Sequence, residues 1–68
     1  MAKFIEVSAK PRSGNQSQYR KALINIEQIS AVKEIEEGGE TCEIVLANAI
    51  LEVDASYEDI RKKARNAS

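Results

Sequence analysis

The acidic residues are the first candidates for chemistry in this chain. Carboxylates such as Glu34 with Glu43, or Glu52 with Asp54, would lie near one another on neighbouring strands, as a general acid and a general base do. Such catalysis also needs a pocket that perturbs a pKa, which the outside of a small sheet does not provide. The spacing of the acids fits no calcium loop. We therefore expect no enzyme, no metal site, no cofactor and no small-molecule substrate.

Other reactive residue types are scarce. The chain has no histidine and one cysteine, Cys42, so it lacks the usual nitrogen ligands and cannot build an internal disulfide framework. Cys42 falls on the predicted core face, where a free cysteine behaves as a small hydrophobe. The polar stretch 10–18 contains Ser, Gly and Asn, but it lacks the phosphate-loop pattern and leads into a strand. We interpret it as a mobile loop.

Residues 31–55 position the acidic side chains, and their pattern predicts two successive β-hairpins. A two-residue turn at Gly38–Gly39 suits the positive φ angles that such turns require. This turn would place Val32 opposite Val45 and Glu34 opposite Glu43. A second turn at Asn48–Ala49 would place Ile44 opposite Val53.

The two registers agree on which side chains share a face. The predicted core face consists of Ala31, Lys33, Ile35, Cys42, Ile44, Leu46, Leu51, Val53 and Ala55. The predicted outer face consists of Glu34, Glu36, Thr41, Glu43, Glu52 and Asp54, with an apolar end of Val32, Val45, Ala47 and Ile50. A three-residue first loop would pair Glu43 with Lys33 instead. We prefer the two-residue loop, because each buried aliphatic side chain is worth about 1.5 to 3 kcal/mol and one exposed charge conflict costs at most about 1 kcal/mol.

The remaining segments complete a fold that is mainly β (α+β). Strands are expected at Lys3–Ala9 and Tyr19–Ile26, with one 3₁₀ turn at 26–29. Ser56 is a good N-cap for a helix over about residues 57–66. The prediction is a single domain over 1–68: a small bent antiparallel sheet or half-open barrel of about five strands with one C-terminal helix.

Charge is segregated along the chain although the formal net charge is only −1. Residues 1–21 hold five basic residues and one acid (+4), residues 22–60 hold one basic residue and ten acids (−9), and residues 61–68 hold four basic residues (+4). No run of about 18 apolar residues is long enough to span a membrane, and no signal peptide is evident. We expect a cytoplasmic protein that does not enter a membrane.

Part of the sequence follows a recognisable order of features. The residues that carry it are Leu23, Asn25, Ile29, Ile35, Ile44, Leu46, Asn48, Val53, Ser56, Glu58 and Ile60. In this order the stretch from Leu23 to Ile60 resembles the small flagellar FlbD-like (SwrD-like) proteins and their phage and mobile-element relatives of unknown function. The resemblance implies a non-enzymatic protein attached to some larger assembly.

Two functional hypotheses follow. The leading one is a small interaction or adaptor module that binds a protein partner, or itself, through the outer sheet face. The residues expected to contact that partner are Val32, Val45, Ala47, Ile50, Glu34, Glu43 and Glu52. The alternative is a small nucleic-acid-binding barrel that uses basic residues, a stacking ring and the basic C-terminal helix. Its expected contacts are Lys10, Arg12, Tyr19, Arg20 and Lys21.

Overall fold

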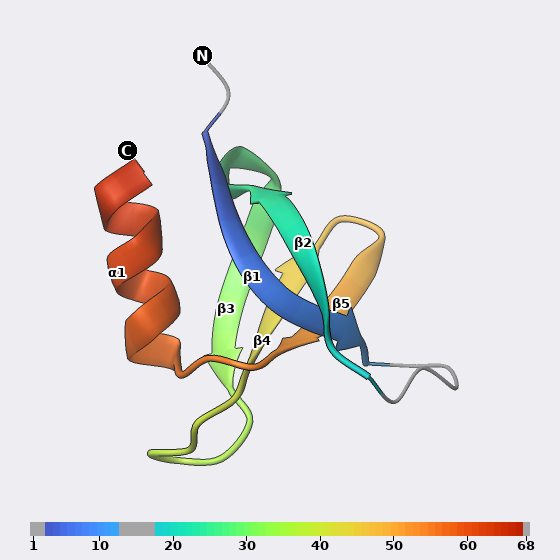
Figure 1. The fold of residues 1–68 in the computed structure, drawn as a ribbon, viewed down its shortest axis with the longest axis vertical. Coiled ribbons are helices and arrows are strands. Elements are labelled where there is room, and N and C mark those ends of the chain that lie inside the picture. Colours follow the sequence, from blue (N-terminus) through green and yellow to red (C-terminus); the bar gives the residue numbers. More distant parts are fainter. Residues whose placement is uncertain (1–2, 13–17, 68) are drawn as a thin grey trace.

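Five antiparallel strands and one C-terminal helix make up the computed structural model, which describes residues 3–12 and 18–67 (Figure 1). The elements are β1 (Phe4–Pro11), β2 (Arg20–Asn25), the 3₁₀ helix η1 (Ile26–Gln28), β3 (Ile29–Glu34), β4 (Cys42–Leu46), β5 (Ala49–Val53) and α1 (Tyr57–Ala67). The strands form one open sheet in the order β2-β1-β5-β4-β3. The predicted fold class is therefore confirmed.

The first hairpin depends on alternation of β-forming residues. Ile5 pairs with Ile24 and Val7 with Ala22, and Ile5, Val7 and Ile24 are buried on one face. β1 runs further than predicted, because Lys10 and Pro11 belong to the strand and pair with β5. Pro11 has no N–H to offer, which is tolerated at a strand end. The loop predicted at 10–18 therefore begins later, and its residues 13–17 lie outside the described part of the chain.

The connection between β2 and β3 forms as its sequence predicts. The side-chain oxygen of Asn25 accepts a hydrogen bond from the backbone N–H of Glu27 at 2.9 Å, which caps η1. Ile26 and Ile29, on either side of this single turn, pack against the core. The turn thus brings the chain from one edge strand of the sheet to the other.

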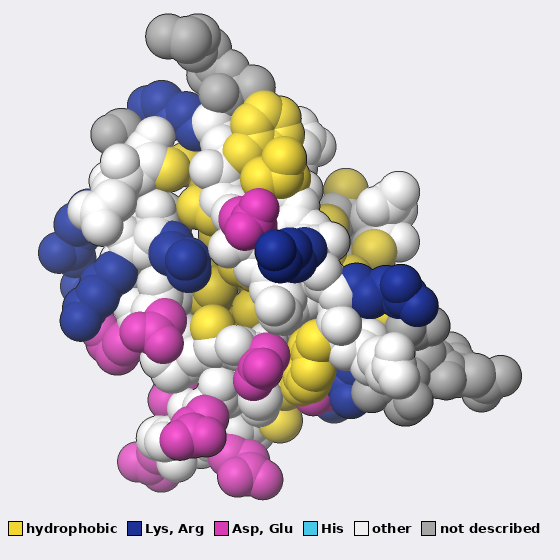
Figure 2. Space-filling view, in the orientation of Figure 1, with side chains coloured by type: hydrophobic (Ala, Val, Ile, Leu, Met, Phe, Trp, Pro, Cys, Tyr) yellow, Lys and Arg dark blue, Asp and Glu magenta, His cyan; other side chains and the backbone are white. Residues whose placement is uncertain are grey.

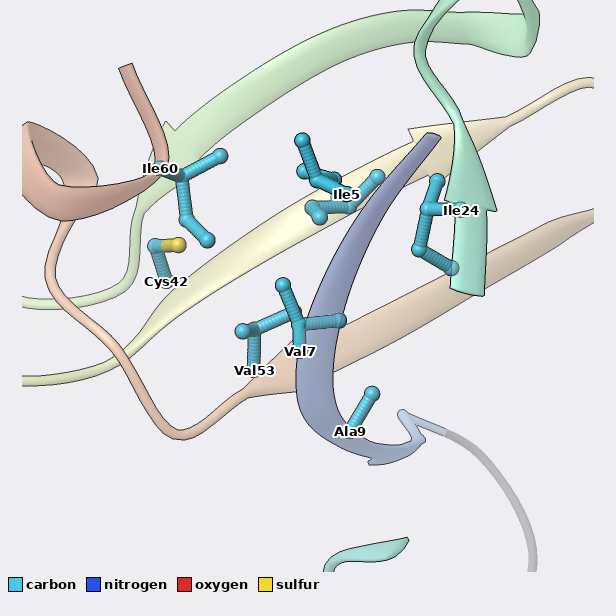
Figure 3. Packing of buried hydrophobic residues seen from close by; sticks show 8 residues of the cluster. Ile5, Val7, Ala9, Ile24, Cys42, Val53 and Ile60 are labelled. Carbon is cyan, nitrogen blue, oxygen red and sulfur yellow. The ribbon is translucent and has the colours of Figure 1, made fainter. Parts of the chain in front are cut away.

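The core lies between the bent sheet and the helix. Its buried members are Ile5, Val7, Ala9, Ile24, Cys42, Ile44, Val53 and Ile60 (Figure 3). Ile60 is the one buried residue of α1, and its side chain lies beside Cys42. The predicted N-cap is present, since the Asp59 N–H donates to Ser56 Oγ at 3.2 Å. The helix contacts β1 and β3, so it covers the concave side of the sheet.

The predicted register of the β3–β4 hairpin is wrong by one residue. Val32 pairs with Ile44 and Lys33 with Glu43, and residues 35–41 form the connection. A shift of one residue turns every side chain to the other face. Val32 therefore packs against the core and Lys33 lies outside, the reverse of the prediction. This register replaces the expected opposition of two glutamates by an opposite-charge pair, and it buries Val32 as well.

The β4–β5 turn is also displaced, by one residue, and this moves the pairing of the two strands by two residues. The turn uses Ala47–Asn48, and Ala49 begins β5, so that Ile44 pairs with Leu51 and Cys42 with Val53. The observed register opposes the apolar residues Val45 and Ile50, whereas the predicted one would have opposed Val45 to Glu52. The turn at Ala47–Asn48 forms without positive φ, since no described residue other than glycine has positive φ. A two-residue displacement keeps the faces unchanged, so Cys42, Ile44 and Val53 are in the core as predicted.

The conformation of the β3–β4 loop depends on the positive φ of Gly38, and substitution of Gly38 tests this dependence. Its φ is +71°, and it lies within a turn closed by the Gly39 N–H donating to the Glu36 carbonyl at 2.9 Å. An added Cβ would meet no atom within 4 Å, so the cost of Gly38→Ala is backbone strain alone. We expect Gly38→Ala to lower the free energy of unfolding by about 1 kcal/mol in urea denaturation. Gly38→Asn should cost less, because asparagine tolerates positive φ; an equal loss would contradict this account.

Candidate functional site

The register of the sheet brings charged side chains into one row on its outer face, the face opposite the buried core. Lys33 of β3 pairs with Glu43 of β4, Glu43 pairs with Glu52 of β5, and Glu52 pairs with Lys10 of β1. Two carboxylates therefore stand directly opposite each other in the middle of this row. Like charges so placed destabilise a sheet unless a counter-charge reaches them.

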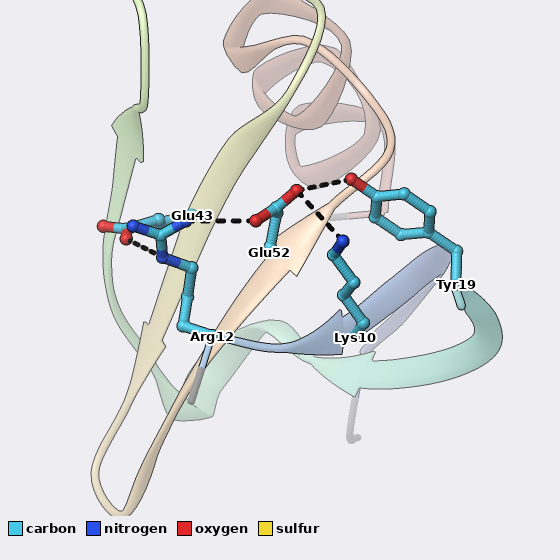
Figure 4. A network of polar contacts seen from close by, with 5 residues as sticks. All are labelled: Lys10, Arg12, Tyr19, Glu43 and Glu52. Atoms are coloured by element: carbon cyan, nitrogen blue, oxygen red, sulfur yellow. Dashed lines mark hydrogen bonds and ion pairs between the residues drawn. The ribbon is translucent and has the colours of Figure 1, made fainter. Parts of the chain in front are cut away.

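Arg12 supplies that counter-charge from just beyond the end of β1. Its backbone N–H donates to the Ile50 carbonyl at 3.0 Å, which holds it beside β5. Its guanidinium then spans the two acids, with Nε 2.7 Å from Glu43 Oε2 and Nη1 3.0 Å from Glu52 Oε1 (Figure 4). The planar, multi-donor guanidinium suits this bridging role better than an ammonium group would.

Tyr19 and Lys10 contact the other side of the Glu52 carboxylate. The Tyr19 hydroxyl donates to Glu52 Oε2 at 2.6 Å, and Lys10 Nζ lies 3.7 Å from the same oxygen. Lys10 Nζ also lies 4.8 Å from the centroid of the Tyr19 ring, within range of a cation–π interaction. Glu52 is therefore the centre of a network that joins β1, β4, β5 and the residue preceding β2; we call Lys10, Arg12, Tyr19, Glu43 and Glu52 the Glu52 network.

The network shifts two pKa values in opposite directions. The Tyr19 hydrogen bond, with the Arg12 hydrogen bond and the charges of Lys10 and Arg12, lowers the pKa of Glu52 against the opposing effect of burial. The hydrogen bond to Glu52, aided by burial and by the charges of Glu52 and Asp54, raises the pKa of Tyr19 to about 12. Near neutral pH, Glu52 is a carboxylate acceptor and Tyr19 a neutral donor. Neither group is close to the pKa that proton transfer at neutral pH favours.

The carboxylates and the thiol outside this network are the groups relevant to metal binding and nucleophilic catalysis. Within residues 3–12 and 18–67, no three His, Cys, Asp or Glu side chains come together as a metal-binding group. Burial raises the pKa of the Cys42 thiol, with a smaller contribution from Asp59, which disfavours the reactive thiolate. No helix in the described chain is long and apolar enough to cross a membrane.

The structure divides the residues predicted to bind a protein partner. Val45 and Ile50 form a cross-strand pair on the outer face, with Ile50 45% exposed, and Ala47 lies exposed in the adjacent turn. Glu43 and Glu52 are on the same face but are neutralised by Arg12 and Lys10. The prediction that Val32 and Glu34 lie on the outer face is wrong. Their register places them on the inner side, where Val32 packs on the core and Glu34 Oε2 accepts from the Gly38 N–H at 3.2 Å.

The residues predicted to bind nucleic acid are divided as well. Lys10, Arg12 and Tyr19 belong to the Glu52 network, so each contacts an acid of its own chain. Arg20 and Lys21 lie apart on β2 and are exposed. Figure 2 shows basic side chains over α1 and over β1 and β2, the two strands nearest the viewer. Acidic side chains gather at the end of the molecule where the β3–β4 loop lies.

Two exposed apolar residues were not among the predicted contacts. Phe4 is 51% exposed and Leu23 is 67% exposed, and both lie on the outer face where β1 and β2 come together. An apolar cluster is visible there in Figure 2. The sequence could have predicted this exposure. Phe4 and Leu23 are the strand neighbours of the buried residues Ile5 and Ile24, and neighbouring side chains on a strand point to opposite faces.

Removing Arg12 should expose the conflict between the two acids. We expect Arg12→Gln to lower the free energy of unfolding by about 0.5 to 1 kcal/mol, a value limited by the partial exposure of the guanidinium. In a Glu43→Gln background the same change should cost less, because the carboxylates no longer oppose each other. A double-mutant cycle by urea denaturation measures the difference; equal costs in both backgrounds would contradict the bridging role.

The pKa of Tyr19 can be measured in a Tyr57→Phe variant, in which it is the only tyrosine. Its ultraviolet titration should give a pKa of about 12, and adding Glu52→Gln should move it toward 10. Because the folded pKa lies above the unfolded one, this hydrogen bond stabilises the fold below pH 10, and the effect is lost as pH rises to about 12. A titration near pH 10 with Glu52 intact would show that the hydrogen bond is not formed.

Comparisons with known proteins add no identification. No protein-family model matches this chain, and no curated protein or solved structure is significantly similar to it. The resemblance to FlbD-like proteins therefore stays a prediction from the residues quoted above.

Proposed function

We propose that this protein is a non-enzymatic interaction module that binds a protein partner, a second copy of itself included, through the outer face of its sheet. One observation carries the proposal: Phe4, Leu23 and Ile50, the exposed large hydrophobic residues of the described chain, all lie on this face. Scattered apolar residues are common on protein surfaces, but their restriction to one face is typical of a contact surface.

The Glu52 network supports the same proposal by neutralising the middle of the face. With Arg12 and Lys10 against Glu43 and Glu52, the charges of this group cancel. A partner that covers the face therefore meets paired charges and not isolated ones, and burying isolated charges would be far more costly. Apolar contact at the ends of the face, rather than attraction of one charge sign, would supply the affinity.

The same network weakens the nucleic-acid alternative. To bind phosphates or stack on a base, Lys10, Arg12 and Tyr19 would first have to leave Glu43 and Glu52. Arg20 and Lys21 are exposed on β2 and the other basic residues of this alternative lie on α1, so these cations are divided between two elements and do not form the single basic stripe that such modules present on the sheet. The interaction module is therefore the better-supported function.

The contribution of the β4–β5 end of the face can be tested with Ile50→Glu. Ile50 is exposed, so the substitution should leave the fold intact, and circular dichroism would verify this. Size-exclusion chromatography with light scattering should show that the wild type self-associates as its concentration rises, and that Ile50→Glu reduces this association.

Asn66→Glu provides a matched control, because it adds the same charge at an exposed position of α1. It should behave as the wild type. A wild type that stays monomeric up to millimolar concentration would rule out self-association, and equal behaviour of Ile50→Glu and Asn66→Glu would exclude Ile50 from the contact.

A further inference from the structure

The two edges of the sheet differ in how well they are protected against pairing with another strand. Both edges carry exposed charges, Arg20 and Lys21 on β2 and Lys33 and Glu34 on β3, but β3 also carries a register shift between Ile29 and Ala31. Bulges of this kind are common devices against edge pairing. β2 pairs with β1 without interruption over all six residues, and it carries Leu23, the most exposed of the large hydrophobic residues. The β2 edge is therefore the less protected of the two.

The free backbone groups of β2 belong to the same residues that face outward. The Ile26 N–H donates to the Lys3 carbonyl at 2.9 Å, which makes Lys3 and Ile26 a hydrogen-bonded pair in the β1–β2 register. In an antiparallel ladder such pairs alternate with pairs that do not exchange hydrogen bonds. Ile24 consequently bonds to β1, whereas Leu23 directs its N–H and C=O away from β1, toward the open edge.

We propose that a second copy of this chain pairs with the β2 edge about a two-fold axis, with Leu23 directly opposite Leu23 of the other copy. The inference rests on the proposed function, because it names a second copy as a partner of that surface. In this register, Lys21 pairs with Asn25 of the other copy. The Asn25 carbonyl already accepts the first hydrogen bond of η1, so the central Leu23 pair is the one that exchanges two hydrogen bonds. The two sheets then join into one.

Charge disfavours one neighbouring register. Moving the axis by two residues would place Lys21 opposite Lys21 of the other copy, and directly opposed like charges destabilise a sheet. With the axis at Leu23, the lysines lie at opposite ends of the new ladder, each beside an uncharged asparagine. The contact is also self-complementary, as a two-fold interface must be.

Phe4 extends the apolar part of the contact. It pairs with Asn25 on β1 and so lies diagonally beside Leu23 on the outer face. The dimer would thus place two leucines together, with a phenylalanine of each copy on either side. A single strand pair is smaller than the roughly 800 Å² per partner of a standard interface, so the dimer should be weak and should depend on concentration.

Cysteine cross-linking tests the register directly. In Leu23→Cys the paired Cα atoms would lie about 5.5 Å apart, within the range of a disulfide. Lys21→Cys is the matched control, since it is exposed on the same face of the same strand, but the two cysteines would be about 13 Å apart. The native Cys42 is buried and can stay. Under mild oxidation we expect a covalent dimer of Leu23→Cys at a concentration where Lys21→Cys remains monomeric.

Sedimentation velocity then separates this inference from the proposed function. Leu23→Lys should abolish this β2 dimer, whereas Ile50→Glu should weaken only further association through the β4–β5 end of the face and leave the β2 dimer intact. Cross-linking that is equal for the two cysteine variants, or a dimer that Leu23→Lys leaves intact, would overturn the β2 pairing. If Ile50→Glu removes the association in that case, the outer-face function stands without the β2 dimer.

Discussion

Burial of Cys42 and Ile44 is the constraint on which the rest of this structure depends. The side chains of Cys42 and Ile44, both on β4, are fully buried in the core. Because side chains alternate along a strand, Glu43 between them must point outward. The register with β5 then places Glu52 directly opposite Glu43. Two opposed carboxylates need a counter-charge, and Arg12 supplies it. The pairing of β1 with β5 places Arg12 beside the two carboxylates. The burial of Cys42 and Ile44 on the inner face thus determines which charged side chains meet on the outer face.

That arrangement changes how the charge segregation of the chain should be interpreted. The sequence-based hypotheses assigned basic residues of the N-terminal region to a nucleic acid and acidic residues of the middle region to a protein partner. In the fold, Lys10 and Arg12 meet Glu43 and Glu52 of the same molecule. Two of the 10 basic and two of the 11 acidic residues of the chain therefore neutralise one another in the middle of the outer face.

Side-chain alternation and capping rules were sufficient to predict the element order, the N-cap at Ser56, the 3₁₀ turn after β2 and the burial of Cys42, Ile44 and Val53. They were insufficient for register. The choice between Val32 and Lys33 as the inward residue depended on how seven residues cross between β3 and β4, and the local pattern at Gly38–Gly39 does not specify this. The Glu52 network was equally inaccessible, because it joins residues up to 40 positions apart that are neighbours only through the β1–β5 ladder.

That ladder is short. β1 and β5 pair from Ala9–Val53 to Pro11–Leu51, with one further backbone hydrogen bond at each end, from the Asp54 N–H to the Ser8 carbonyl and from the Arg12 N–H to the Ile50 carbonyl. The β1–β2 hairpin and the β3–β4–β5 meander have ladders of five or six pairs. The molecule is therefore two locally connected units that meet along a narrow seam, closed by core side chains and by Arg12. Units of this kind can open separately before the whole chain unfolds. The strength of the seam sets how cooperatively this small protein folds.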